Sequence, residues 1–332
     1  MAAGARRLNR ARWTRRAPWI ELDAAGAVDL LRPVIGAAEV ISLRRVGGGL
    51  VHTNLDVKLT GPPGRVLLRL YQRDPDCARK EAALDAMVGG RVPTARFLHF
   101  SETSPVTGGP YAALQWIDGV QLDHAAQQAD AAELRTLGAA VGDVLARIHA
   151  FRFDRAGFFT PDLRVATAID FDGAGLLRFM HQCLREGPGG ERLGAALTDR
   201  LCSFVQREGH RLDAWLGDPR LTHSDCNPSN ILVHCDAGRW RVAAMLDWEY
   251  ALSATPAFDF GNLLRAPLGE QAAFVDGVAD EYRAAGGVLP DDWRAVARIA
   301  DLFAWADLLG RREADVALAA DARRAILATL EL

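Results

Sequence analysis

The chain has 332 residues, 49% of them hydrophobic, and a formal net charge of −3 at pH 7. A chain of this length is usually longer than one that folds around a single hydrophobic core, so two lobes are predicted. No apolar run reaches the roughly 18 residues of a membrane span, and the five scattered cysteines show no zinc-binding spacing, which favours a reducing, cytoplasmic location without membrane partners.

Charge is unevenly distributed along the chain. Residues 1–20 contain six Arg and no acid but lack the apolar segment of a secretory signal, so residues 1–24 are predicted to form a disordered basic tail, with an organelle transit segment as the alternative. Residues 1–117 hold 17 Lys and Arg against 10 Asp and Glu, whereas residues 118–332 hold 22 against 32. A basic first part suits phosphates, and an acidic second part suits a cationic substrate and disfavours nucleic acid as a partner.

The first part of the chain predicts an antiparallel sheet. Residues 25–35 and 76–88 have helical patterns, the second with apolar residues three to four apart. Short segments rich in Val, Ile and Leu predict strands at residues 39–45, 52–59, 65–71, 96–100 and 111–117. We therefore expect an N-terminal lobe over residues 25–117, with a five-stranded antiparallel sheet and one helix packed on it.

The rest of the chain is predicted to be mainly helical. Residues 131–150 place Leu134, Leu137 and Val141 on one face, and the end of the chain is rich in Ala, Leu and Arg. Between these stretches, residues 232–234 and 241–246 are strand-like and flank a D-A-G hairpin turn signal. Together the two parts predict an α+β fold, with a mainly helical lobe over residues 118–332.

The most informative segment begins at Leu221 and reads L-T-H-S-D-C-N-P-S-N-I-L-V. It contains His223, then Asp225, then Asn230 five residues after Asp225, and the strand that follows its hairpin ends at Asp247. Transfer of a phosphoryl group needs a carboxylate to orient the attacking hydroxyl and oxygen ligands for Mg²⁺. The five-residue offset is that of the protein-kinase catalytic loop H-R-D-x-x-x-x-N. We therefore predict that Asp225 is the catalytic base and that Asn230 and Asp247 bind magnesium.

These motifs resemble those of the aminoglycoside phosphotransferase and choline kinase group, which are small-molecule relatives of protein kinases. The resemblance runs from about Val46 to Tyr282 and includes D-W-E at Asp247, where protein kinases have D-F-G. It implies a bilobal protein-kinase-like fold, with residues 25–117 as the nucleotide-binding lobe. It also implies transfer of the γ-phosphate of ATP, with Mg²⁺, to a hydroxyl of a small molecule.

The resemblance leaves the acceptor open, because acceptor specificity in this group lies in the variable C-terminal helices. Aminoglycoside-like antibiotics, amino alcohols and sugar metabolites all suit it, and neither a preference for GTP nor the oligomeric state follows from the sequence. A cationic acceptor would favour acids in the second lobe, where the unranked candidates are Glu249, Asp276, Asp280 and Glu281. A catalytically silent nucleotide-binding module is the alternative function, although neither the base nor a metal ligand is missing.

A triple glycine at residues 47–49 lies between two predicted strands. It is not the kinase pattern G-x-G-x-x-G, and by itself a triple glycine is typical of a flexible turn. It is similar to the Gly-Gly-x-Ser-Asn loop of the family. The resemblance implies that Gly48 and Gly49 cover the nucleotide phosphates and that Thr53 and Asn54, in the Ser-Asn positions, direct backbone or side-chain donors toward them.

A basic residue on the third predicted strand takes the place of the kinase lysine. Arg69 has apolar neighbours, and an inward charge there is costly unless it is paired, so Glu81 on the next helix is its predicted partner. Lys80 competes for this role, but its place beside Glu81 on a helix should point it elsewhere. Gln115 and Ile117 are expected to present backbone groups to the adenine.

Asp259 begins a D-F-G sequence, but it lies 34 residues after Asp225 and does not end the strand that follows the catalytic hairpin. We therefore assign the metal to Asp247. Asp259 is expected either to hold the catalytic loop by hydrogen bonds, as the family resemblance implies, or to cap a helix. His223 is expected to have a structural role.

Overall fold

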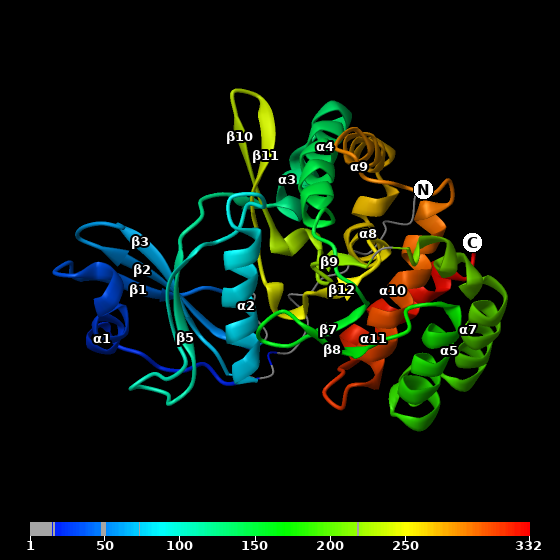
Figure 1. Ribbon diagram of the computed structural model, residues 1–332, viewed down its shortest axis with the longest axis horizontal. Coiled ribbons are helices and arrows are strands. Elements are labelled where there is room, and N and C mark those ends of the chain that lie inside the picture. Colours follow the sequence, from blue (N-terminus) through cyan, green and yellow to red (C-terminus); the bar gives the residue numbers. More distant parts are fainter. Residues whose placement is uncertain (1–14, 16, 48–50, 73, 218) are drawn as a thin grey trace.

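Figure 1 shows the computed structural model, which describes residues 15, 17–47, 51–72, 74–217 and 219–332. A β-rich N-terminal lobe lies beside a larger and mainly helical lobe. Within the described ranges, no helix is long and apolar enough to cross a membrane. The predicted α+β class, with two lobes of these kinds, is confirmed.

The N-terminal lobe is built on a five-stranded sheet in the order β1-β2-β3-β5-β4, with every neighbouring pair antiparallel. This is the predicted sheet, with ends that differ from the expected ones by one or two residues. Its strands are β1 (Val40–Arg45), β2 (Thr53–Leu59), β3 (Arg65–Leu70), β4 (Phe97–Ser101) and β5 (Tyr111–Gln115).

Alternation along β3 directs its side chains toward two different helices, because successive residues of a strand point to opposite faces. Leu68 and Leu70 pack with α1 (Ala24–Ile35) in one hydrophobic cluster. Arg69 points to the other face, toward α2 (Pro75–Val88). The sheet therefore has a helix on each face, rather than the single packed helix that the sequence predicted, and Arg69 lies on the face toward α2.

The segment before α1 departs from the predicted tail. Residues 1–14 and 16 lie outside the described residues, so the disorder expected there stays a prediction. Ile20 and Leu22, however, pack against the cluster between α1 and the sheet, and Ile20 N–H donates to Thr53 Oγ1 at 3.0 Å. Residues 17–23 therefore belong to the N-terminal lobe, because it covers their apolar side chains. The lobe boundary at residue 117 stays a prediction.

The second lobe combines long helices with short strands. Its helices are α3 (Leu122–Gln128), α4 (Ala131–Ile148), α5 (Gly173–His181), α6 (Gly189–Leu193), α7 (Ala195–Glu208), α8 (Ala257–Leu263), α9 (Ala272–Ala284), α10 (Trp293–Gly310) and α11 (Val316–Thr329). Its strands are β6 (Val120–Gln121), β7 (Gly157–Phe159), β8 (Val165–Ala168), β9 (Arg220–Thr222), β10 (Ile231–Asp236), β11 (Arg239–Met245) and β12 (Leu252–Ala254). The predicted hairpin is β10 and β11, whereas the sheet β8-β7-β12-β9 was not predicted.

Helix α4 begins at a capping box formed by Asp130 and Glu133 and packs closely along α9. Glycines allow this close approach. A Cβ at Gly138 or Gly142 would lie 2.1 or 2.4 Å from a carbonyl oxygen of α9, and a Cβ at Gly277 would lie 2.1 Å from a carbonyl oxygen of α4. These positions exclude any side chain unless the two helices move apart.

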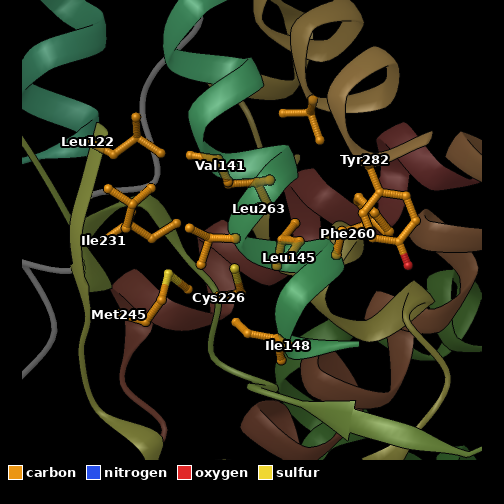
Figure 2. Close-up of a cluster of buried hydrophobic side chains, with 14 of the residues drawn as sticks. Leu122, Val141, Leu145, Ile148, Cys226, Ile231, Met245, Phe260, Leu263 and Tyr282 are labelled. Carbon is orange, nitrogen blue, oxygen red and sulfur yellow. The ribbon is translucent and has the colours of Figure 1, made fainter. Parts of the chain in front are cut away.

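The buried side chains of the second lobe form two hydrophobic clusters. The first joins α4, α8 and α9 to the β10–β11 hairpin and includes Leu145, Ile231 and Met245 (Figure 2). The second joins α5, α7, α10 and α11 and includes the fully buried Trp305. The segment that contains Asp225 contacts the first cluster through Cys226.

Candidate active site

Arg69 lies at the centre of a buried polar network that joins the two lobes. Its Nη1 donates to both carboxylate oxygens of Glu81, at 3.0 and 3.3 Å, and its Nε donates to Asn54 Oδ1 at 3.0 Å. Its Nη2 donates to Asp247 Oδ1, in the second lobe, at 2.7 Å. Burial by itself would lower the pKa of Arg69, but Glu81 and Asp247 outweigh burial and hold this pKa well above its ordinary value. The guanidinium is therefore charged, and four hydrogen bonds fix its orientation.

The catalytic segment folds around the carboxylate of Asp225. Asn227 Nδ2 donates to Oδ1 at 3.0 Å, and Asn230 Nδ2 donates to Oδ2 at 2.9 Å. Asn227 also caps the short 3₁₀ turn at residues 228–230, because its Oδ1 accepts the Ser229 N–H at 3.2 Å. Since the amide nitrogen of Asn230 faces Asp225, its amide oxygen is directed away from that carboxylate, as a metal ligand would require.

The β10–β11 hairpin brings Asn230 and Asp247 to the same end of a strand pair. Ile231 is opposite Met245, and one position further Leu246 N–H donates to the Asn230 carbonyl oxygen at 2.8 Å. Asp247 follows directly, with a left-handed backbone at φ 60°, a conformation that Asp adopts more readily than most residues. The antiparallel register therefore places the two predicted metal ligands side by side.

Asp259 holds the backbone of the catalytic segment from α8. It is fully buried, and its carboxylate accepts the N–H of His223 at 2.9 Å and the N–H of Ser224 at 2.7 Å. His149, at the end of α4, donates its Nε2–H to the same carboxylate at 3.0 Å. Ser224 has a left-handed backbone at φ 62°, so Asp259 stabilises a strained turn immediately before Asp225. These bonds correspond to the first of the two roles expected for Asp259.

Neither His223 nor Cys226 is in a form suited to catalysis. Asp225 N–H donates to His223 Nδ1 at 3.3 Å, so the ring proton lies on Nε2, which donates to the Leu246 carbonyl oxygen at 2.8 Å. Backbone groups thus occupy both ring nitrogens. Figure 2 shows the Cys226 sulfur among buried side chains such as Met245, and burial raises the pKa of this thiol well above its ordinary value. Both residues anchor the catalytic segment.

A second contact between the lobes is made by Glu249. His52 Nε2 donates to its carboxylate at 3.3 Å, and Cys77 Sγ lies 3.8 Å from the same oxygen. Lys80 Nζ donates to the Glu249 carbonyl oxygen at 2.5 Å, and burial lowers the pKa of this amine. Lys80 therefore binds the backbone of the second lobe and does not occupy the position that Arg69 holds.

His52, Cys77 and Glu249 have ligand types that bind zinc, and their nearest ligand atoms all lie within 4.8 Å of one another. One hydrogen bond argues against a metal there. Gln72 N–H donates to His52 Nδ1 at 3.2 Å, so the ring proton lies on Nε2, the nitrogen that faces Glu249. A protonated Nε2 has no lone pair for a metal. We therefore assign this cluster to hydrogen bonding between the lobes.

Thr53 and Asn54 point to opposite sides of β2. Asn54 is opposite Arg69 in the register of β2 and β3 and accepts its hydrogen bond. Thr53 is fully buried on the other side, where its hydroxyl donates to Gln72 Oε1 at 2.7 Å. The side chains of the two residues therefore cannot both face the phosphates, because neighbouring residues of a strand point to opposite faces. A contact of Thr53 with the phosphates would have to come from its backbone and stays a prediction.

The remaining predicted nucleotide contacts are less well supported. Gly48 and Gly49 lie outside the described residues. The N–H of Gln115 already donates to the Arg96 carbonyl oxygen at 2.8 Å, since β5 pairs with its neighbours up to that residue. Its N–H is thus not available to an adenine, which leaves Ile117, two residues after the strand, as the candidate backbone donor.

Residues 42–324 match the phosphotransferase enzyme family, APH. The chain belongs to this family. No curated protein matches the chain, but solved structures share its fold. Aminoglycoside 2'-phosphotransferase-IIIa, as its GDP complex, is 17% identical over 93% of this chain and 99% of that chain, with a TM-score of 0.69. A mutant of aminoglycoside phosphotransferase APH(4)-Ia, in complex with AMP-PNP and hygromycin B, is 19% identical over 91% of this chain and 97% of that chain, with a TM-score of 0.62. Macrolide 2'-phosphotransferase MphH from Brachybacterium faecium is 21% identical over 90% of this chain and 97% of that chain, with a TM-score of 0.61.

Membership of the phosphotransferase family confirms the predicted reaction class. The phosphotransferase transfers phosphate from ATP to a hydroxyl group of a small molecule, and reactions of this kind use Mg²⁺. The oxygen donors near the hairpin, the Asp247 carboxylate and the Asn230 amide, are of the kind that Mg²⁺ prefers. The bilobal protein-kinase-like fold agrees with this assignment.

The acids considered for a cationic acceptor of the phosphotransferase do not converge on one place. Asp276 and Asp280 lie on the exposed side of α9 and form ion pairs with Arg294 of α10 and Arg135 of α4, respectively. Glu281 lines a groove of about 660 Å³ beside α4 and β11, and this groove contains none of the predicted site residues. Only Glu249 lies next to the network, through its contact with His52.

Three side chains near the site of the phosphotransferase were not predicted. His52, immediately before β2, contacts Glu249 and the backbone N–H of Gln72, and Gln72, two residues after β3, also accepts from the Thr53 hydroxyl. Arg15 reaches the same strand from the basic N-terminal segment. The alternation of β2 could have separated Thr53 from Asn54, but no sequence pattern identifies the other three contacts.

Proposed function

We propose that Asp225 is the catalytic base of the phosphotransferase, that Asn230 and Asp247 bind Mg²⁺, and that Arg69 binds the nucleotide phosphates. The observation that supports these roles most is the contact of Arg69 Nη2 with Asp247 Oδ1 at 2.7 Å. It joins the cationic side chain of one lobe to the acidic ligand of the other, beside the hairpin that begins at Asn230. Glu81 and Asn54 hold the guanidinium in this orientation.

The carboxylate of Asp225 is suited to orient an acceptor hydroxyl and to take its proton. It is largely buried, and two amide donors fix it in place. A fixed base saves the entropy of bringing the hydroxyl into line with the phosphate. Mg²⁺, when bound, neutralises charge that develops on the transferred phosphoryl group. Arg69 adds a second, permanent positive charge beside the phosphates.

For the acceptor, we propose a hydroxylated small molecule that carries positive charge, such as an aminoglycoside-like antibiotic. Two observations support this choice. Residues 118–332 have ten more acidic than basic residues, and an acidic lobe attracts cations. One structural neighbour, a mutant of aminoglycoside phosphotransferase APH(4)-Ia, forms a ternary complex with AMP-PNP and hygromycin B. Amino alcohols and sugar metabolites are the other outcomes of the test.

The test is acceptor-dependent consumption of ATP and of GTP, measured against panels of aminoglycosides, macrolides, amino alcohols and sugars, with the phosphorylated product identified by mass spectrometry. Asp225→Asn is the matched control, because it keeps the size and most hydrogen bonds of the side chain. Turnover by the wild type with a cationic acceptor, and its loss in the control, is the expected result. Nucleotide binding without turnover for every acceptor would identify a catalytically silent binding module instead.

A cytoplasmic location is proposed on two grounds. All five cysteines belong to the described part of the chain and are free thiols, as proteins of a reducing compartment usually have. The nucleotide substrate is also supplied there. Fractionation of cells that express the full chain checks this location, and recovery with a secreted or membrane fraction would contradict it.

A further inference from the structure

Arg15, from the basic segment ahead of α1, lies against the start of β2. Its Nη1 donates to the His52 carbonyl oxygen at 3.0 Å, and its Nη2 donates to the Val51 carbonyl oxygen at 3.0 Å. Nη2 also lies 3.5 Å from Thr53 Oγ1 and 3.3 Å from Gln72 Oε1. One guanidinium thus contacts three consecutive residues of the chain.

The neighbours of Arg15 are themselves held by the N-terminal lobe. Ile20 N–H donates to Thr53 Oγ1 at 3.0 Å, and Gln72 Nε2 donates to the Pro18 carbonyl oxygen at 2.7 Å. The guanidinium of Arg15 lies 3.8 Å from the centre of the Trp19 ring, within the range of a cation–π contact. The segment therefore presents Arg15 to β2 in one orientation.

The residues that Arg15 contacts are next to residues of the proposed site, in the chain and in space. Asn54, which follows them, accepts a hydrogen bond from Arg69. His52, whose carbonyl oxygen Arg15 binds, donates its Nε2–H to Glu249 in the second lobe. A shift of residues 51–53 would therefore alter both contacts, so Arg15 acts on Arg69 and Glu249 through these residues.

We propose that Arg15 is a positioning residue for the nucleotide phosphates: it fixes residues 51–53, so that Asn54 and His52 hold Arg69 and Glu249 in the geometry that ATP needs. The proposal rests on the phosphate-binding role of Arg69. A planar guanidinium is suited to the task because its fork serves two neighbouring carbonyl oxygens at once, which the single ammonium of lysine does less well.

The test compares Arg15→Ala and Arg15→Lys in the full chain with Arg32→Ala, which removes an exposed arginine of α1 that pairs with Asp29. Binding of ATP, ADP and adenosine is measured by calorimetry for each variant. Arg15→Ala is expected to weaken ATP and ADP binding about tenfold or more, as the loss of hydrogen bonds from a charged donor implies. Adenosine binding should not change, Arg15→Lys should be intermediate, and Arg32→Ala should match the wild type.

Two outcomes would overturn the proposal. Arg15→Ala could bind ATP as tightly as Arg32→Ala does, or it could weaken adenosine by the same factor as ATP, which would indicate a general effect on the fold. If the alanine variant does not fold, the lysine variant decides, because its loss of affinity must still be larger for ATP than for adenosine. A wild-type protein that transfers no phosphate would refute the proposed function but leave this binding comparison intact.

Discussion

Replacing Glu81 by alanine tests the buried network around Arg69. The side chains of Arg69 and Glu81 expose only 8% and 4% of their surface, and removal of one partner from a buried pair usually costs about 3 to 5 kcal/mol. Arg69 would keep its bonds to Asn54 and Asp247, which places the expected loss at the lower end. We therefore expect the free energy of unfolding to fall by about 3 kcal/mol, or roughly a hundredfold in the equilibrium constant.

Urea denaturation, followed by tryptophan fluorescence and circular dichroism, measures this loss. Glu102→Ala is the matched control, because Glu102 pairs with Arg79 on the surface, where the two side chains expose 58% and 45%, and such pairs contribute about 1 kcal/mol or less. Glu81→Gln should lie between the two, since the amide keeps an acceptor for the Tyr71 hydroxyl but loses the charge. Equal urea midpoints for Glu81→Ala and Glu102→Ala, with equal slopes, would refute the assignment of a buried ion pair.

Three further predictions concern the catalytic segment and the helix pair behind it. Asp225→Asn should bind ATP like the wild type, measured by calorimetry, but transfer phosphate about 10² to 10⁴-fold more slowly, measured by steady-state kinetics. An unchanged rate of transfer would show that another residue is the base. Asp247→Ala should remove the Mg²⁺ dependence of ATP binding, whereas Asp259→Ala should slow phosphate transfer and keep that dependence. Magnesium titrations of ATP binding measure both effects, and the reverse pattern would show that Asp259 is the metal ligand. Gly138→Val should lower the free energy of unfolding by at least about 1 to 3 kcal/mol, because its Cβ would lie 2.1 Å from a carbonyl oxygen of α9, and an unchanged melting temperature would show that the helices can separate at little cost.

Much of the N-terminal lobe follows from local sequence patterns. Each of its five strands has five to seven residues, enough for alternation and turn signals to mark it. The strands of the unpredicted sheet β8-β7-β12-β9 have only three or four residues each. Segments this short are too short to show an alternation of apolar and polar residues, so their strand conformation depends on pairing with strands that are distant in the sequence.

The candidate site divides in the same way between local and distant contacts. Asp225 and Asn230 belong to one turn, and the hairpin register carries Asp247 to the same place, so spacing along the chain predicts the group. The pair of His52 and Glu249 is separated by 197 positions, and no local pattern connects them. Arg15 is 37 positions from the carbonyl oxygen that it binds. The roles assigned to these residues stay predictions until the variants are measured.

The division of the second lobe into two hydrophobic clusters has a consequence for the design of variant libraries. Helix α8 contributes Phe260 to the cluster beneath Asp225 and Phe258 to the cluster of α5, α7, α10 and α11. Because α8 belongs to both clusters, a substitution that moves this helix disturbs the packing of both of them. Libraries that vary the cluster residues of α5, α7 and α11 and leave α8 unchanged should therefore retain a larger fraction of folded protein than libraries directed at α8.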